Sequence, residues 1–346
     1  MAQINKPNLH FNTVLYTGNG GTQSITGVGF QPDWVWIKRR NSSGGNMITD
    51  VVRGVTNTIV TNETSATQTL ANGLTAFGTD GFTVGSESGF NGSSDTFVSF
   101  NWKAANSAGS ANTDGSISST VSVNTTAGFS IVKYVGNATS GATVGHGLGA
   151  APDAMIIKNY STSGAQWTVF NQSLGNTKGM QLDSTAVAGT SAAYWNNTSP
   201  SATVFTLGNG GDPNGNGANT IAYCFKSIKG YSKFGSYTGN GNADGTFIYT
   251  GFKPAWIMTK RATGSTNEWY VYDNKRTPTN PSLAYIVSNT NSAENNGSQQ
   301  DRDMLSNGFK IRNGNAAQNA SGSTYIYMAF AENPIVGTNN IPATAR

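Results

Sequence analysis

Short apolar segments alternate with Gly, Asn, Asp and Pro along the whole chain. The segments are about 4–8 residues long and rich in β-branched and aromatic side chains, which is typical of β-strands. No window keeps apolar residues at the i, i+3, i+4, i+7 spacing of an amphipathic helix beyond a turn or two. Turn residues recur about every 8–12 residues, a spacing typical of β-sandwiches and jelly rolls. The pattern therefore predicts an all-β fold.

Residues 33–39 illustrate how such a strand uses both of its faces. Successive side chains of a strand point to opposite faces. One face carries Trp34, Trp36 and Lys38, and the other carries Val35, Ile37 and Arg39. Both faces begin apolar and end basic, which predicts a central sandwich strand whose C-terminal end emerges at the rim. Pro32 precedes the strand, where its missing N–H removes no ladder hydrogen bond.

The segment around this strand occurs three times along the chain. The copies are Gly29-Phe-Gln-Pro-Asp-Trp-Val-Trp-Ile-Lys-Arg39, Gly149-Ala-Ala-Pro-Asp-Ala-Met-Ile-Ile-Lys-Asn159 and Gly251-Phe-Lys-Pro-Ala-Trp-Ile-Met-Thr-Lys-Arg261. Their shared structural signature is Pro32, Trp34 and Lys38, then Pro152 and Lys158, then Pro254, Trp256 and Lys260. Internal repetition of this kind is the sequence mark of tandem structural units.

The segments that flank these copies recur in one order. Each copy follows a Tyr-x-Gly-Asn turn, at Tyr16, Tyr134 and Tyr237, and ends on an aromatic strand-like segment. After the signature, the second and third copies carry Trp167-Thr-Val-Phe170 and Trp269-Tyr-Val-Tyr272. The first copy has only Met47-Ile-Thr49 there, so we expect its core to be packed differently.

The ordered landmarks predict three tandem β-sandwich repeats of a jelly-roll-like kind. We call them unit 1 (9–106), unit 2 (124–228) and unit 3 (229–336). Between units 1 and 2, the Ser/Thr/Gly-rich stretch 107–123 is predicted to be a linker. Residues 337–346 are predicted to form a C-terminal tail.

Composition narrows the classes of function. Charged residues make up 11% of the 346 residues, and the net charge of +4 forms no basic stripe, so we expect no nucleic-acid partner. The N-terminus lacks the apolar core of a secretory signal, and no apolar run reaches the roughly 20 residues of a membrane span. We therefore expect no membrane insertion. The single cysteine, Cys224, lies in an apolar run and is predicted to be a core residue.

No motif in the sequence assigns a catalytic, metal-binding or cofactor-binding residue. Thr17-Gly-Asn-Gly-Gly-Thr22 lacks the Lys-Ser/Thr and helix that a phosphate loop requires. His10, His146 and Cys224 are too far apart in sequence for a standard zinc site. Asp301 and Asp303 could hold a surface calcium, but no calcium-loop pattern follows them. Carboxylates considered for glycoside hydrolysis, which recur in no convincing pattern, are Asp80, Glu87, Asp95, Glu268 and Asp273. Asp50, Asn171 and Asp273 align roughly after the second strand, where turn capping explains them equally well.

Tryptophan offers a candidate glycan contact. Most tryptophans fall inside predicted strands, which favours core packing. Trp195 lies in the loop-like stretch Tyr194-Trp-Asn-Asn197 and is predicted to be the best exposed of them. Beside it, Asn196 and Asn197 could hydrogen-bond sugar hydroxyls.

The signature segment, the Tyr-Thr-Gly-Asn-Gly turn and the ending Tyr327-Met-Ala-Phe-Ala-Glu-Asn-Pro334 resemble a family of virion structural proteins. These proteins are encoded by marine tailed phages that infect cyanobacteria and related ocean bacteria. The resemblance covers nearly the whole chain. It implies a repeated β-sandwich module on the particle exterior, assembled in the host cytoplasm, with other capsid or tail proteins as partners. It implies no catalytic residues.

Three hypotheses of function follow. The first is a non-enzymatic virion surface protein, either a capsid decoration, a knob, or a tail or fibre component. The absence of a fibre shaft from the sequence favours a compact decoration, knob or tip. The second is a carbohydrate-binding, lectin-like module that attaches to host surface glycans, and the third, weaker one is a glycan hydrolase. The three units could supply a three-fold axis within one chain, or the protein could form a homotrimer.

Overall fold

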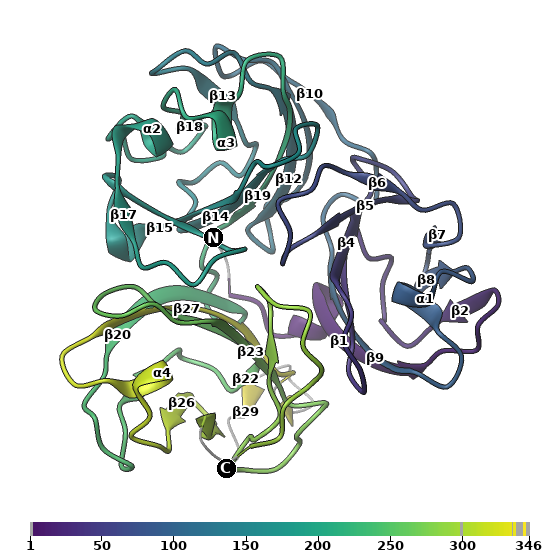
Figure 1. Ribbon diagram of the computed structural model, residues 1–346, viewed down its shortest axis with the longest axis vertical. Coiled ribbons are helices and arrows are strands. Elements are labelled where there is room, and N and C mark those ends of the chain that lie inside the picture. Colours follow the sequence, from purple (N-terminus) through teal and green to yellow (C-terminus); the bar gives the residue numbers. More distant parts are fainter. Residues whose placement is uncertain (1–2, 298–299, 334, 337–341, 344–346) are drawn as a thin grey trace.

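The structure is a computed structural model that describes residues 3–297, 300–333, 335–336 and 342–343. Antiparallel strands dominate the described residues, so the all-β class is confirmed. Three β-rich regions surround a common centre, coloured purple to blue, teal, and green to yellow in Figure 1. They correspond to units 1, 2 and 3 in chain order.

Each unit contributes one larger sheet. That of unit 1 runs β1 (Phe11–Thr17), β9 (Thr96–Trp102), β3 (Trp34–Arg39), β4 (Asn46–Asp50), β5 (Asn57–Val60) and β6 (Gln68–Thr69). That of unit 2 runs β10 (Ser110–Asn112), β11 (Ser119–Asn124), β12 (Phe129–Val135), β19 (Asn219–Phe225), β14 (Ala154–Asn159), β15 (Trp167–Asn171), β16 (Lys178–Gln181) and β17 (Gly189–Thr190). That of unit 3 runs β20 (Ser232–Thr238), β27 (Thr324–Ala331), β22 (Pro254–Arg261), β23 (Trp269–Asp273) and β24 (Ile286–Val287). In all three, the closing aromatic strand lies between the first strand and the signature strand.

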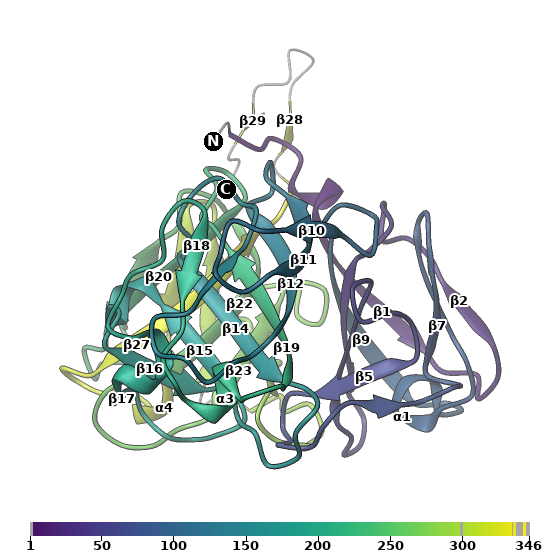
Figure 2. The ribbon, with the colours of Figure 1, turned by 90° about the horizontal axis from the view of Figure 1, so that it is seen from above.

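Smaller elements cover the outer face of each larger sheet. The small sheets are β2 (Gln23–Ile25), β8 (Gly81–Val84) and β7 (Leu74–Gly78); β13 (Thr143–Gly145) and β18 (Val204–Thr206); and β21 (Phe247–Tyr249), β26 (Gly308–Ile311) and β25 (Arg302–Leu305). The short helices are η1 (Pro7–Leu9), α1 (Ser88–Asn91), η2 (Gln172–Leu174), α2 (Ala192–Trp195), α3 (Gly211–Asn214) and α4 (Ala316–Asn319). A last pair, β28 (Ile335–Val336) and β29 (Pro342–Ala343), lies outside the three larger sheets (Figure 2).

The signature strand β3 packs on both faces, as its alternation predicts. Trp34 and Trp36 belong to the core shared by all three units. Val35 and Ile37 point the other way, into a core with residues of the small sheet β2-β8-β7. The prediction that the basic end of the strand emerges at the rim is wrong for Lys38, which is fully buried.

The shared core is aromatic and joins every pair of units. Its contacts include Trp34 with Tyr223 (ring centroids 4.6 Å apart), Trp102 with Trp256 (5.6 Å) and Phe225 with Phe330 (6.1 Å). The first contact joins units 1 and 2, the second units 1 and 3, and the third units 2 and 3. Each large aromatic ring buries much apolar area, so this centre provides extensive apolar contact between the units.

The stretch 107–123 is more than the linker that its composition predicts. It contains β10 and most of β11, which extend the sheet of unit 2 beyond β12. Ile117 and Val121 bury their side chains in the core of unit 2. The hydroxyl of Ser119 donates to Gly145 O at 2.9 Å, so a polar side chain is accommodated in a buried position. Of the predicted tail, only 342–343 is described.

Each Tyr-x-Gly-Asn turn is fastened to a short helix. In unit 1, Tyr16 donates its hydroxyl hydrogen to Phe90 O at 2.7 Å. Gly18 follows, and a Cβ there would collide with Gly92 O, so the turn admits only glycine. The equivalent hydroxyl bonds are Tyr134 to Pro213 O (2.6 Å) and Tyr237 to Gln318 O (2.9 Å). The motif therefore ties the first strand of each unit to the helix before its closing strand.

Candidate functional site: the surfaces between the units

Neighbouring units meet through side chains at one equivalent strand position. That position, opposite the signature lysine, is held by Asn46, Trp167 and Trp269. Each side chain donates a hydrogen bond to a main-chain carbonyl of another unit. The bonds are Trp167 Nε1 to Val60 O (3.0 Å), Trp269 Nε1 to Gln181 O (2.9 Å) and Asn46 Nδ2 to Val287 O (3.2 Å). Asn46 thus replaces tryptophan in unit 1 and makes the equivalent bond.

Main-chain hydrogen bonds repeat the same pattern a few residues further along. The first set is Gly164 N to Thr64 O (2.9 Å), Asn267 N to Thr185 O (2.9 Å) and Gly44 N to Asn291 O (2.8 Å). The second set is Thr67 N to Tyr160 O (2.8 Å), Ala188 N to Ala262 O (3.1 Å) and Glu294 N to Arg40 O (2.8 Å). In each set unit 2 meets unit 1, unit 3 meets unit 2, and unit 1 meets unit 3. The contacts therefore close a ring.

The three signature lysines are buried at these contacts. Lys38 Nζ donates to Asn291 O of unit 3 at 3.1 Å, and Lys260 Nζ donates to Thr185 O of unit 2 at 3.0 Å. Lys158 Nζ instead donates to Ala165 O within its own unit. Burial lowers the pKa of each lysine to about 8. These groups position chain segments at the unit boundaries.

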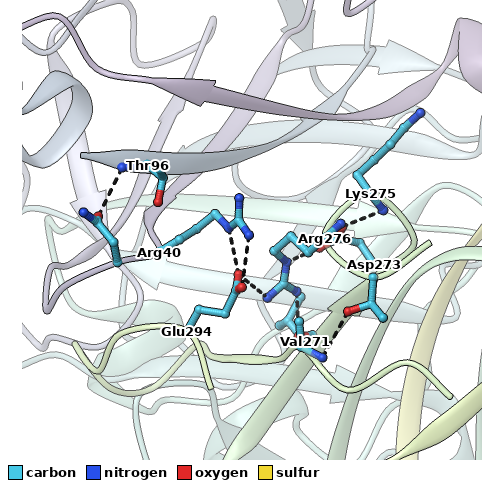
Figure 3. Close-up of polar contacts among 10 residues, drawn as sticks. Arg40, Thr96, Val271, Asp273, Lys275, Arg276 and Glu294 are labelled. Carbon is cyan, nitrogen blue, oxygen red and sulfur yellow. Dashed lines mark hydrogen bonds and ion pairs between the residues drawn. The ribbon is translucent and has the colours of Figure 1, made fainter. Parts of the chain in front are cut away.

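One boundary, between units 1 and 3, also carries a network of ion pairs (Figure 3). Arg40 of unit 1 makes two hydrogen bonds to the carboxylate of Glu294, at 2.8 and 3.1 Å. Glu294 also pairs with Arg276 Nη1 at 3.3 Å, and Arg276 pairs with Asp273. Burial raises the pKa of Glu294, but the two guanidinium groups outweigh it and hold the pKa below its usual value. At the other two boundaries the equivalent pairs are uncharged: Tyr160 with Thr67, and Ala262 with Ala188.

The aligned residues Asp50, Asn171 and Asp273 all cap turns. Each side-chain oxygen accepts a main-chain N–H two residues further on, from Val52, Ser173 and Lys275. Asp50 also pairs with Arg53 and accepts a hydrogen bond from the Tyr223 hydroxyl at 2.7 Å, across the boundary with unit 2. All three side chains therefore stabilise turns of the fold.

The other carboxylates considered for hydrolysis or calcium are dispersed. Asp80 accepts hydrogen bonds from Gly27 N and Gly29 N, which lower its pKa. Glu87 stands at the N-cap position of α1 without a side-chain capping bond. Asp95 pairs with Arg39 at 3.2 Å, and Glu268 accepts a hydrogen bond from Asn289. Asp303 pairs with Arg312 at 3.3 Å, and Asp301 Oδ1 is buried and has no hydrogen-bond partner among the described residues. Among the described residues, no three His, Cys, Asp or Glu side chains gather to hold a metal ion.

The prediction that Trp195 is exposed is wrong. Its side chain is 1% exposed, packs against Phe170 and donates from Nε1 to Lys178 O at 2.9 Å. Asn196 takes the left-handed conformation that ends α2, and Asn197 is exposed beside it. The indole is a core group of unit 2, so these residues form no sugar-stacking surface.

Cys224 is the buried core residue that its apolar run predicts. Burial raises the pKa of its thiol to about 12. Burial lowers the pKa of both His10 and His146. The Nε2 of His146 lies 3.3 Å from Ser201 O.

Two grooves lie at equivalent places between units. The 2/3 groove, with a volume of about 480 Å³, is lined by Asp153, Gln172, Lys226, Lys229, Lys233 and Tyr249 among others. The 3/1 groove, of about 240 Å³, is lined by Asn8, Asn12, Asn274, Lys275, Glu332 and Asn333 among others. Strand register makes the two places equivalent. In unit 3, Ser232 pairs with Phe330 of the closing strand, and Lys233 follows it. In unit 1, Phe11 pairs with Trp102 of the closing strand, and Asn12 follows it. Concave sites between domains are common places for ligands.

Sequence reasoning missed two groups of residues. The groove residues come from distant segments, and only their final arrangement brings them together. The buried Asn91, Asn214 and Asn319, which anchor the three turns, carried a signal. They stand at one spacing before Thr96, Asn219 and Thr324, where the closing strands begin.

Comparison with known families places the chain. Residues 6–334 match the family model described as a domain of unknown function, DUF7483. The chain therefore belongs to that family. No curated protein and no solved structure matches it. No helix among the described residues is long and apolar enough to cross a membrane.

Proposed function

We propose that this chain is a non-enzymatic structural protein on the exterior of a phage particle. In this proposal its three units are copies of one two-layer β-sandwich. The observation that carries it is the closed ring of equivalent contacts around a shared aromatic core. Hydrogen bonds between units and a shared buried core stabilise the folded state, which a protein exposed outside the cell requires.

The ring also supports a docking role. The side chains at the strand position opposite the signature lysine make their hydrogen bonds inside the molecule. They are Asn46, Trp167 and Trp269. The loops and grooves left on the outside differ between units in charge and side chains. Such an arrangement suits a rigid body with approximate three-fold geometry that meets other capsid or tail proteins through distinct surfaces. In this proposal one chain supplies that geometry, and a homotrimer is the alternative.

The test is quantitative mass spectrometry of purified particles together with a particle reconstruction. The proposal predicts that the chain is present in intact particles and that density for its three-unit ring lies on the outer surface. Hundreds of copies per particle would place it on the capsid, and about six to eighteen would place it on the tail. Absence from purified particles, or a position inside the capsid, would contradict the proposal.

A carbohydrate-binding adhesion module remains the second candidate. Its first support, an exposed Trp195, is lost. The 2/3 groove offers a different one, because Tyr249 exposes its ring there.

A further inference from the structure

Tyr249 is placed where the fold does not need it. Its side chain is 59% exposed, the most of any large apolar side chain among the described residues. The neighbouring Ile248 is the side chain that β21 buries in the core of unit 3. In unit 1 the residue after the equivalent Ile25 is Thr26, which follows the end of β2, so the fold accepts a small polar residue at this place. The aromatic ring therefore serves the surface.

Two of the three lysines that line the 2/3 groove lack a matching anion. Lys226 pairs with Asp153 at 2.7 Å. Lys229 and Lys233 have no carboxylate partner among the described residues, so the groove carries a net positive charge. Lys233 Nζ donates to Tyr249 O at 2.9 Å and lies 5.2 Å from the centre of the tyrosine ring. The ammonium group therefore lies over one face of the exposed aromatic ring.

The equivalent 3/1 groove shows that neither feature is required by the fold. Asparagines dominate its polar lining, which holds one lysine, Lys275, and one carboxylate, Glu332, so the lining has no net formal charge. Glu332 itself pairs with Lys253 at 2.7 Å. In register, Asn12 stands where the 2/3 groove has Lys233. Two places with the same strand geometry therefore differ in charge and in the exposed aromatic ring.

We propose that the 2/3 groove binds an acidic saccharide, one that bears sulfate or carboxylate groups. The apolar face of a sugar ring would pack on Tyr249, as amphipathic aromatic rings allow. The ammonium groups of Lys229 and Lys233 would bind its anionic groups through charge-assisted hydrogen bonds. Gln172 and Ser227 on the groove wall would meet its hydroxyls. The volume of about 480 Å³ suits a small ligand. This inference rests on the second candidate function, the carbohydrate-binding module, and does not depend on the structural role proposed first.

The experiment is calorimetric titration of the full chain with an oligosaccharide of a sulfated galactan. The desulfated oligosaccharide, inorganic sulfate and a single-stranded oligonucleotide serve as comparison probes. We expect the sulfated oligosaccharide to bind best, and more weakly in high salt because salt screens exposed charges. We expect Tyr249→Ala and Lys233→Gln each to weaken binding by about fivefold to tenfold.

Two matched variants control the experiment. Lys275→Gln removes a lysine from the 3/1 groove, and Phe247→Ala removes another exposed aromatic ring of β21. Both should bind like the unmodified chain. The inference is overturned if the sulfated oligosaccharide does not bind, if Tyr249→Ala binds it equally well, or if the desulfated sugar, free sulfate or the oligonucleotide binds as tightly. Particle composition would be unaffected by any of these results, so the proposed structural role is tested separately.

Discussion

At the scale of single residues, buried polar side chains fasten segments that are far apart in sequence. Asn214 is fully buried and makes three hydrogen bonds to main-chain groups. Its Oδ1 accepts from Asn137 N at 2.9 Å, and its Nδ2 donates to Thr139 O at 3.1 Å and Gly208 O at 2.7 Å. Asn91 and Asn319 have equivalent bonds in units 1 and 3.

Replacing Asn214 should therefore be costly. Asn214→Ala removes the partner of one buried main-chain group, Gly208 O, and of two part-buried groups, Asn137 N and Thr139 O. A buried group left unpaired costs about 1–3 kcal/mol. After partial relaxation we expect the free energy of unfolding to fall by about 2–4 kcal/mol. Urea denaturation measures this, with Asn209→Ala, at an exposed position without positive φ, as the control that stays within about 0.5 kcal/mol. A loss for Asn214→Ala as small as that of the control would show that the turn holds without this anchor.

At the scale of elements, the signature strands combine apolar packing with one buried lysine each. The pKa of Lys38, Lys158 and Lys260 is about 8 in the folded chain, below the 10.5 of a free side chain. Between these values the unfolded chain binds more protons than the folded chain. Stability must therefore rise with pH in this range, because deprotonation relieves the cost of a buried charge.

The range from pH 8 to pH 9 lies below the usual pKa of tyrosine but overlaps that of cysteine, so the test uses a Cys224→Ala background, which removes the thiol. Each lysine should add about 1 kcal/mol to the free energy of unfolding across that pH unit. Denaturation at both pH values measures the sum, and Lys158→Met should remove about a third of the increase. A free energy of unfolding that stays level or falls over this range would contradict the lysine assignment.

Sequence patterns predicted the strands and their faces better than the tertiary contacts and burial of the residues around them. Alternation along residues 34–37 correctly separated the two packed faces, because a strand has a fixed period of two. It could not show that Lys38 ends beside a carbonyl of unit 3, since that partner is distant in sequence. Local composition made 107–123 a linker and Trp195 exposed, yet tertiary packing buries Val121 and the indole. The grooves depend on how units meet, which no local pattern contains.

At the scale of the whole molecule, three boundaries share one set of contacts and one of them is reinforced by charge. Arg40 and Glu294 join the first and last units, so they fasten the point where the chain closes its ring. Glu294 is nearly buried, and its second partner Arg276 is fully buried. Buried, hydrogen-bonded pairs couple more strongly than exposed ones.

A double-mutant cycle tests the reinforcement. Arg40→Met and Glu294→Gln, alone and together, should give a coupling free energy of about 1–3 kcal/mol in denaturation experiments. Lys253 and Glu332 form the matched exposed pair, and their cycle should give less than about 1 kcal/mol. Equal coupling in the two cycles would mean that the closing ion pair contributes no more than a surface contact.

Ring closure around a shared core implies that the units do not unfold independently. Trp34, Trp256 and Phe225 belong to that core, and separating the units would expose all of them to water. Scanning calorimetry of the full chain measures this directly. We expect one cooperative transition, with the calorimetric enthalpy equal to the van't Hoff enthalpy. Three separable transitions, each with the enthalpy of a unit of about 100 residues, would contradict it.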